Sequence, residues 1–397
     1  MAHAQAVGES GGSLTINKKM EGNKMINMQS MPKLGFGLMR LPEQNGEIDL
    51  PQVCRMVDAY MEKGFNYFDT AYVYHGGKSE TAVKEAIVKR YPRESFYLAT
   101  KLPGWAMSGP EDRDRIFNEQ LERCGVDYFD FYLLHSLEDG PNYDTYVKYD
   151  CFQWAMQKKE EGKIKHFGFS YHGTPALLEQ VLEEHPEIEF VQIQLNYADW
   201  NNQVVHSGRL YEILHERQIP IIVMEPVKGG TLANLQPELQ DMLKAVHPDA
   251  SAASWALRFV GSLDGVMTIL SGMSNEQQME DNLRTFTAFE PLSEQEKQVI
   301  NAVVEKMLDM PLIPCTSCRY CCDGCPARIR IPDVFRALNT VRMYPGDNRP
   351  HMFYNGLTSD SGKASACIAC GQCERVCPQH LQIIELMKEA AGKLDKR

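Results

Sequence analysis

Short apolar runs alternate with amphipathic stretches over residues 30–310, which indicates strands alternating with helices. The runs that we predict as strands are Leu34–Leu38, Phe65–Thr70, Phe96–Thr100, Tyr128–Leu134, His166–Ser170, Phe190–Leu195, Ile219–Met224 and Val266–Leu270. The stretches with helical periodicity that follow them are Gln52–Lys63, Glu80–Arg90, Asp112–Arg123, Thr145–Glu161, Pro175–Glu184, Gly208–Arg217, Ala250–Val260 and Glu276–Arg284. Eight strands that are each followed by a helix predict an α/β fold of the (β/α)8, or TIM, barrel type. A doubly wound open sheet is the alternative, but no Gly-rich GxGxxG turn supports it.

The character of the chain changes after this part. Ser293–Leu308 is predicted as an extra amphipathic helix, and the proline-containing stretch Met310–Pro314 follows it. Nine of the 12 cysteines lie beyond that stretch. Residues 315–397 carry 12 Lys and Arg against 8 Asp and Glu, whereas the residues before them carry 29 against 45. We therefore predict an N-terminal tail at 1–29 (disordered or a short hairpin), the barrel at 30–310 and a second domain at 311–397.

The overall composition is typical of a globular protein, with 43% hydrophobic and 24% charged residues. No run approaches the ~18 apolar residues of a membrane helix, and residues 1–29 lack the apolar core of a signal peptide. The net charge of −12 argues against a nucleic-acid partner, which usually binds a basic surface. We therefore expect a cytoplasmic protein that binds neither membrane nor nucleic acid; the sequence carries no signal for its oligomeric state.

Four ionisable side chains lie at the predicted ends of three successive strands. Asp69 ends the second strand, Tyr74 follows in its loop, and Lys101 and His135 end the third and fourth strands. Because adjacent strands lie about 4.8 Å apart and a barrel carries its chemistry at their carboxyl ends, we expect these groups to converge. Taken singly, each has a structural explanation: a helix cap, a packing aromatic, a surface charge or a buried histidine.

Together, the four groups suit reduction of a carbonyl. A phenol with a pKa of about 10 is a poor proton donor near neutrality, and a nearby ammonium lowers that pKa. A carboxylate keeps the ammonium charged, and an imidazole can orient the substrate oxygen. Hydride has to come from a cofactor, because no side chain supplies it.

The order and spacing of these residues resemble those of the aldo/keto reductase superfamily. The motif Phe-Asp69-Thr-Ala-x-x-Tyr74, then Thr-Lys101, then Leu-Leu-His135 carries the likeness, which extends over residues 31–290. The resemblance implies that Tyr74 is the proton donor, that Lys101 and Asp69 tune it, and that His135 orients the substrate. It also implies that Ser170 and Gln192 hold the carboxamide of a nicotinamide, and that the loop from Gly272 to Asn282 cradles the adenosine phosphate. The residues assigned to the cofactor on this basis are Ser170, Gln192, Pro226, Gly229, Gly272, Gln278 and Asn282.

Three positions depart from the common family pattern. Tyr171 follows Ser170 where many members have Asn, and Met224 stands where an aromatic residue usually stacks on the nicotinamide. Gln278 stands where many members have an Arg that grips the 2′-phosphate. Because an Arg fork is the natural partner of a phosphate, the sequence leaves both NADP and NAD open as the cofactor.

Two segments near the carboxyl end repeat the spacing C-x2-C-x2-C-x3-C-P, which binds [4Fe–4S] clusters in bacterial ferredoxins. In two-cluster ferredoxins the cysteine before the proline ligates the other cluster. We therefore expect two clusters with crossed ligands, Cys315, Cys318 and Cys321 with Cys377, and Cys367, Cys370 and Cys373 with Cys325. Structural zinc is the main alternative, and a disulfide framework is a weaker one. Helices predicted at Pro332–Tyr344 and Leu381–Gly392, with a loop at Pro345–Ala366, favour a small, mainly helical ferredoxin-like domain.

These observations predict an oxidoreductase that moves hydride between a nicotinamide cofactor and a small carbonyl or alcohol substrate. The clusters would pass single electrons to or from an electron-transfer protein. The alternative is an electron-transfer or regulatory subunit whose barrel binds nicotinamide without significant turnover. In a third interpretation, the clusters only brace the carboxyl-terminal fold.

Overall fold

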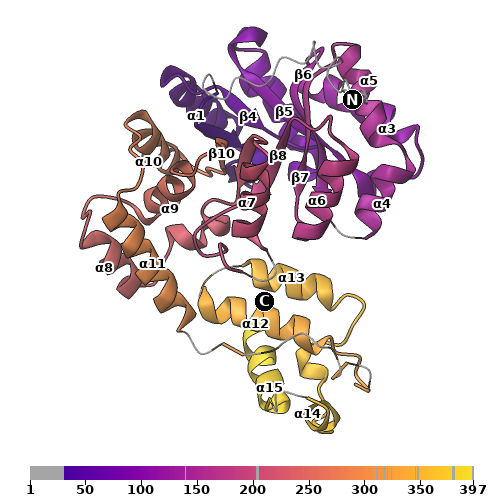
Figure 1. The fold of residues 1–397 in the computed structure, drawn as a ribbon, viewed down its shortest axis with the longest axis vertical. Coiled ribbons are helices and arrows are strands. Elements are labelled where there is room, and N and C mark those ends of the chain that lie inside the picture. Colours follow the sequence, from indigo (N-terminus) through magenta and orange to yellow (C-terminus); the bar gives the residue numbers. More distant parts are fainter. Residues whose placement is uncertain are drawn as a thin grey trace, which may run out of the picture.

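Eight parallel strands close into a barrel in the computed structural model (Figure 1). The structure describes residues 31–138, 140–202, 205–309, 312–313, 315, 319, 321–322, 324–344, 346, 348–377 and 381–395, so the predicted N-terminal tail lies outside it. β1 pairs with both β4 and β10, which closes the ring, and the predicted barrel is confirmed. The strands are β1 Leu34–Gly37, β4 Tyr67–Asp69, β5 Tyr97–Pro103, β6 Phe129–Leu137, β7 Ile164–Tyr171, β8 Phe190–Gln194, β9 Ile221–Met224 and β10 Val266–Ser271.

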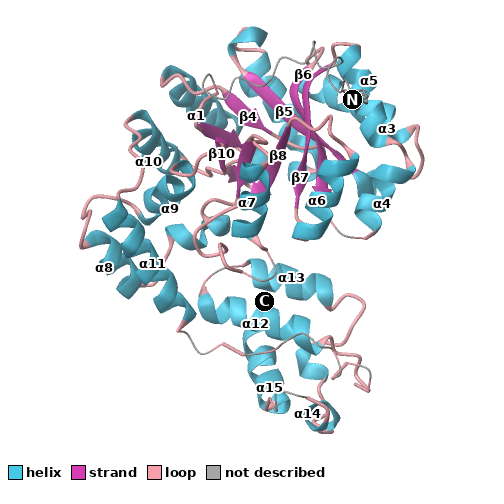
Figure 2. Ribbon diagram, in the orientation of Figure 1, coloured by secondary structure: helices cyan, strands magenta, loops and turns pink. Residues whose placement is uncertain are grey.

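Helices lie outside the strands (Figure 2). They are α1 Leu50–Glu62, α2 Lys78–Val83, α3 Asp112–Cys124, α4 Pro141–Lys148, α5 Cys151–Glu160, α6 Pro175–Glu184, α7 Ser207–Glu216, α8 Pro237–Lys244, α9 Ala252–Gly261, α10 Glu276–Thr287 and α11 Glu294–Leu308. Helices α8 and α11 lie further out, beyond α9. Their apolar spacing explains the packing: α1 buries Val53, Met56, Val57 and Tyr60, which recur on one helical face. Asp49 caps this helix by accepting a hydrogen bond from the backbone of Gln52.

Side chains alternate between the two faces of each barrel strand. On β6, Phe131 and Leu133 belong to an apolar cluster inside the barrel, whereas Tyr132 and Leu134 belong to the larger cluster between strands and helices. A strand that is buried on both faces has a continuous run of apolar residues. All eight strands could therefore be predicted from the sequence.

Several predicted elements differ from the observed ones. The predicted helix Thr145–Glu161 is two helices, α4 and α5, because the backbone turns left-handed at Asp150, where φ is 50°. A short hairpin, β2 Glu43–Gln44 and β3 Glu47–Ile48, and helix α8 were not predicted. The predicted loop Pro345–Ala366 was wrong, because helix α13, Arg349–Leu357, lies within it. Pro350 stands in the first turn of α13, where its missing N–H costs nothing, so the proline there marks a helix start.

The carboxyl-terminal part is helical, as predicted. It consists of α12 Ile331–Met343, α13 Arg349–Leu357, the short α14 Gln372–Arg375 and α15 Ile383–Leu394. These elements share their own apolar cluster, which includes Val334, Leu338 and Met387. Figure 1 shows α13 between the barrel and the other carboxyl-terminal helices. No helix in the described ranges is long and apolar enough to cross a membrane.

Candidate active site

The pleat of the strands brings the predicted catalytic groups to the inside of one barrel rim. Tyr67, Ala99 and Leu133 face the barrel interior on β4, β5 and β6. Asp69, Lys101 and His135 each stand two residues further along the same strands and therefore share that face. Lys101 and His135 do not end their strands as predicted, since β5 continues to Pro103 and β6 to Leu137.

Lys101 and Asp69 form a buried ion pair beneath the rim. The Lys101 side chain has no exposed surface, and its Nζ lies 2.5 Å from Oδ1 of Asp69. The ammonium also donates to the backbone oxygen of Thr70, at 2.8 Å. Burial alone would lower the pKa of Lys101, but the Asp69 carboxylate and the Tyr74 hydroxyl outweigh it and hold that pKa above its ordinary value. Lys101 is therefore a fixed positive charge at neutral pH.

Tyr74 lies over this ion pair, in the loop after β4. Nζ of Lys101 is 5.0 Å from the centre of the Tyr74 ring. Burial raises the pKa of the Tyr74 hydroxyl above its ordinary value, and Lys101 opposes that effect without cancelling it. We expected the ammonium to lower this pKa, and it does contribute in that direction. The net result is a phenol that stays protonated at neutral pH beside a permanent cation.

His135 completes the group from β6. Its ring lies edge-on to Tyr74, with the ring centres 5.8 Å apart, and 5.0 Å from the ring of Trp105. Burial and the charge of Lys101 hold the pKa of His135 well below its ordinary value, so the imidazole is neutral. Its Nδ1 is buried and has no hydrogen-bond partner among the described residues. A neutral imidazole in this position can donate one hydrogen bond to a substrate oxygen.

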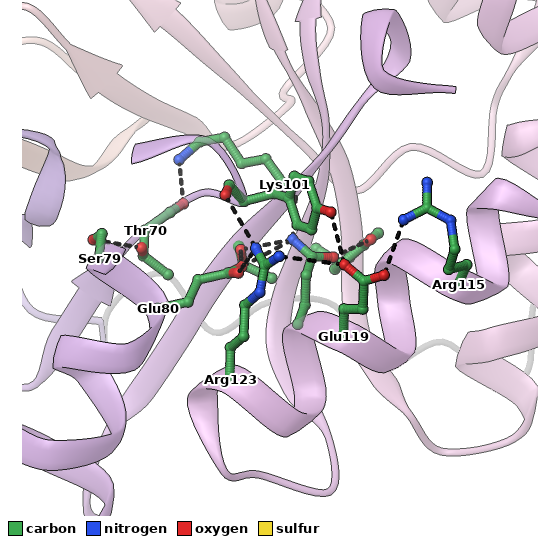
Figure 3. A network of polar contacts seen from close by, with 11 residues as sticks. Thr70, Ser79, Glu80, Lys101, Arg115, Glu119 and Arg123 are labelled. Atoms are coloured by element: carbon green, nitrogen blue, oxygen red, sulfur yellow. Dashed lines mark hydrogen bonds and ion pairs between the residues drawn. The ribbon is translucent and has the colours of Figure 1, made fainter. Parts of the chain in front are cut away.

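Sequence reasoning missed the polar network behind Lys101 (Figure 3). The fully buried Glu80 on α2 accepts hydrogen bonds from Thr100, at 2.8 Å, and from Gln120, at 3.0 Å. Gln120 on α3 also donates to the backbone oxygen of Lys101, at 2.9 Å. Arg123 lies 3.5 Å from the second oxygen of Glu80. The network fixes the strand that carries Lys101.

Two of the predicted cofactor residues lie side by side on neighbouring strands. Ser170 on β7 and Gln192 on β8 are register partners, and both are almost fully buried. Nε2 of Gln192 lies 3.5 Å from the sulfur of Met224, and Oε1 of Gln192 is buried without a partner in the described part of the chain. A buried acceptor without a donor costs free energy, and a primary amide could supply that donor. This pair therefore fits the carboxamide of a nicotinamide.

The remaining predicted cofactor residues lie in the loops after β9 and β10. Pro226 and Gly229 follow β9, and φ at Gly229 is +61°. Gly272 follows β10 directly, and Gln278 accepts a hydrogen bond from the backbone of Ser274, at 2.7 Å. Asn282 on α10 donates to the hydroxyl of Ser271, at 2.7 Å. In this structure, the side chains of Gln278 and Asn282 make hydrogen bonds to residues at the end of β10 and in the loop after it.

A cavity in the carboxyl-terminal part is lined by cysteines from both motifs. Cys325 of the first motif and Cys367, Cys370 and Cys373 of the second line it together, with Ile331 and Met387 among the apolar residues around them. This is the crossed set predicted for one cluster. No three Cys, His, Asp or Glu side chains in the described ranges converge as ligands of a single ion would. A [4Fe–4S] cluster instead needs four sulfurs around a space, since each cysteine binds a different iron, and the cavity fits that need.

The structure describes three of the four cysteines of the other predicted ligand set. Cys318 lies outside the described residues. Cys321 is buried in the carboxyl-terminal apolar cluster, and Cys315 and Cys377 pack against that cluster. Cys322, the cysteine that the crossed assignment leaves spare, also packs there.

Comparison with known proteins agrees with both halves of the chain. A model of the aldo/keto reductase family matches residues 33–305, and one of the 4Fe–4S dicluster domain matches residues 314–382. An aldo-keto reductase of Mycobacterium avium is 28% identical over 64% of this chain and 81% of its own length. The NADH-specific methylglyoxal reductase of Escherichia coli is 25% identical over 64% of this chain and 89% of its own length.

Solved structures show the same fold. The holo form of aldo-keto reductase AKR11C1 from Bacillus halodurans has a TM-score of 0.55 and 26% identity, over 68% of this chain and 91% of that protein. An aldo/keto reductase from Klebsiella pneumoniae in complex with NADP and acetate has a TM-score of 0.56 and 21% identity, over 69% of this chain and 92% of its own. Because the family model spans well over half of the sequence, the chain belongs to the aldo/keto reductase family and carries a 4Fe–4S dicluster domain after its barrel.

Proposed function

We propose that this protein is an oxidoreductase that transfers hydride between a nicotinamide cofactor and a small carbonyl or alcohol. One observation carries the proposal: the protonated Tyr74 lies over the buried Lys101–Asp69 ion pair with the neutral His135 beside it. Proton donor, fixed cation and hydrogen-bond donor are the groups that reduction of a carbonyl oxygen requires.

The proton chemistry follows from the charges. His135 and Tyr74 donate hydrogen bonds to the substrate oxygen and orient it. Tyr74 gives up its proton as negative charge develops on that oxygen, and the Lys101 ammonium stabilises the phenolate that remains. Asp69 holds the ammonium in place at 2.5 Å. In alcohol oxidation the same groups act in reverse, with the phenolate as base.

The cofactor half of the site rests on the paired Ser170 and Gln192 and on the loops after β9 and β10. A nicotinamide bound there supplies or accepts the hydride, which no side chain can do. The E. coli relative is named NADH-specific and the Klebsiella structure contains NADP, so relatives use both forms. For this chain we propose a nicotinamide dinucleotide as cofactor, and the phosphate contacts discussed below bear on which one.

We propose that residues 311–397 carry two clusters and act as an electron-transfer domain beside the barrel of residues 30–310. The two ligand sets are Cys325, Cys367, Cys370 and Cys373, and Cys315, Cys318, Cys321 and Cys377. The first set lies near the surface, because Cys370 is exposed and Ile368 is 68% exposed. A cluster close to an exposed apolar residue is accessible to an electron-transfer protein.

Replacing the proposed proton donor tests this function. Tyr74→Phe should reduce the rate of aldehyde reduction by about 100-fold or more, since general acid catalysis contributes 10²–10⁴-fold. The visible absorbance and iron content of anaerobically purified protein should stay unchanged. Rates should be measured against a panel of aldehydes with both NADH and NADPH.

The matched control is Tyr211→Phe on α7, which removes a hydroxyl that donates only to the backbone of Asp264, at 3.1 Å. It should keep wild-type rates. Full activity of Tyr74→Phe would reject the assigned acid. A wild-type rate no higher than the uncatalysed rate, despite tight cofactor binding, would favour the electron-transfer or regulatory subunit.

A further inference from the structure

Two arginines and a glutamate from distant parts of the chain meet beside the loop that follows β9. Glu225 is the first residue after β9, Arg40 lies in the turn after β1, and Arg349 begins α13 in the cluster domain. One oxygen of Glu225 is 3.1 Å from Nη1 of Arg349, and the other is 3.7 Å from Nη2 of Arg40. Arg349 also donates to the hydroxyl of Thr231 in the same loop. The cluster domain thus places a cation against the barrel.

The guanidinium group of Arg349 and the aliphatic stem of Arg40 each lie against a glycine that the family resemblance assigns to the cofactor. A Cβ added to Gly229 would be 2.5 Å from Nη1 of Arg349, so a larger residue here would require the guanidinium group to move. A Cβ added to Gly272 would be 3.3 Å from Cδ of Arg40. Arg349 therefore borders the loop after β9 and Arg40 the loop after β10, and Glu225 contacts both.

No other side chain of these loops supplies a comparable positive charge. Lys228, the basic residue in the β9 loop, is buried and is paired with Asp199. Gln278 stands where many family members have the phosphate-binding Arg, and it caps its own loop instead. Two guanidinium groups against one carboxylate leave a net positive charge at this position. That charge suits a dianionic phosphate, which an arginine fork binds through two hydrogen bonds.

We propose that Arg349, together with Arg40, binds a phosphate group of the nicotinamide dinucleotide, so that the iron–sulfur domain completes the cofactor site of the barrel. The inference rests on the proposed function, because it needs a dinucleotide in the barrel. Glu225 holds both guanidinium groups in position until the phosphate replaces it as their partner. Docking of the cluster domain and binding of the cofactor are then one coupled event.

The domain contact around Arg349 supports this coupling. Tyr344, at the end of α12, is buried in an apolar cluster with Leu232 and Leu235, which follow the β9 loop. Nζ of Lys228 lies 5.4 Å from the centre of the Tyr344 ring. Tyr344 and Arg349 therefore both contact the region that follows β9.

Equilibrium binding tests the proposal without turnover. Cluster-loaded, anaerobically purified protein is titrated with NADH, with NADPH and with adenosine diphosphate ribose, and the Kd of each is measured by fluorescence or calorimetry. Arg349→Ala should raise the Kd by about 10- to 100-fold, the range expected for loss of charge-assisted bonds. Arg349→Lys should lose less, because an ammonium keeps the charge but lacks the fork. Arg330→Ala, which removes an exposed arginine paired with Asp360 in the same domain, should match wild type.

The three ligands separate the two phosphate sources. A loss for all three ligands assigns Arg349 to the pyrophosphate that they share, whereas a loss for NADPH alone assigns it to the 2′-phosphate. Unchanged Kd values in Arg349→Ala, with wild-type iron content, would overturn the inference while leaving the proposed function intact. Failure of the wild-type protein to bind either dinucleotide would overturn both. If Arg349→Ala loses iron, the comparison is made with Arg349→Lys, for which unchanged Kd values also count against the proposal.

Discussion

At the scale of single residues, burial and one ammonium group act in opposite directions on Tyr74. Burial raises the pKa of the hydroxyl and Lys101 lowers it, with burial the stronger. Sequence reasoning anticipated only the ammonium, because motif spacing shows which groups are neighbours but not how much water surrounds them. On His135, by contrast, burial and Lys101 act in the same direction, and both lower the pKa so that the imidazole stays neutral. The site therefore has only one permanent cation.

These charges predict the pH dependence of carbonyl reduction. The pKa of His135 is lowered well below 6.5, so kcat/KM should not fall as the pH decreases through that value. The pKa of Tyr74 is raised above 10, so the loss of the donated proton should appear only on the alkaline side of pH 10. The measurement is kcat/KM for one aldehyde across this range, with circular dichroism at each pH to check that the protein is folded. A fall of kcat/KM centred near pH 6.5 in folded protein would contradict the assignment.

At the scale of elements, the carboxylate of Glu296 connects helix α11 to helix α9. Ser293 and Glu296 form a capping box at its start. Glu296 also pairs with Arg258 of α9, with Oε2 to Nη2 at 3.1 Å, and with His247, at 2.9 Å. Burial would raise the pKa of Glu296, but Arg258 and the Ser293 cap outweigh it and bring that pKa down to about 2.

This depressed pKa predicts an acid-dependent contribution to stability. Glu296→Gln should lower the free energy of unfolding at neutral pH by about 2 kcal/mol, because Arg258 loses its charged partner. The folded pKa lies below the usual 4.5, so the wild-type advantage is complete above that pH and disappears as the pH falls toward 2. Urea unfolding followed by tryptophan fluorescence measures it. Glu238→Gln, which removes only an exposed partner of Lys306, is the control; a difference that stays constant down to pH 3 would refute the explanation.

Elements were predictable where a local pattern determines them. All eight barrel strands were found because each is a buried apolar run. Asp69, Tyr74, Lys101 and His135 were singled out because their order along the chain is distinctive. Helix α13 was missed because Pro345 and Gly346 precede it and imitate a loop. The network of Glu80, Gln120 and Arg123 was missed because its contacts join residues that are 40 and 43 positions apart. Such partners are fixed by packing, which no short spacing reveals.

At the scale of the whole molecule, two redox-capable parts contact each other through the loop after β9. The cysteine motifs were recognisable in the sequence because three of the four predicted ligands of each cluster lie within a few residues of one another. The contact between Arg349 and Glu225 was not, since 124 positions separate them. It links the cluster domain to the loop that we assign to the cofactor. We propose that electrons pass between the barrel and the cluster domain.

Electron exchange between the two parts is tested most directly by adding NADH or NADPH to cluster-loaded protein under anaerobic conditions and following the visible absorbance of the clusters. Oxidation of NADH or NADPH releases two electrons and one proton; each of two clusters accepts one electron and the proton passes to solvent, so the account predicts bleaching in the wild-type protein. Tyr74→Phe should bleach to the same extent, because no substrate oxygen is protonated in this step. Dithionite provides the fully bleached reference. An unchanged absorbance in protein that dithionite can bleach, and that still reduces aldehydes, would contradict the account.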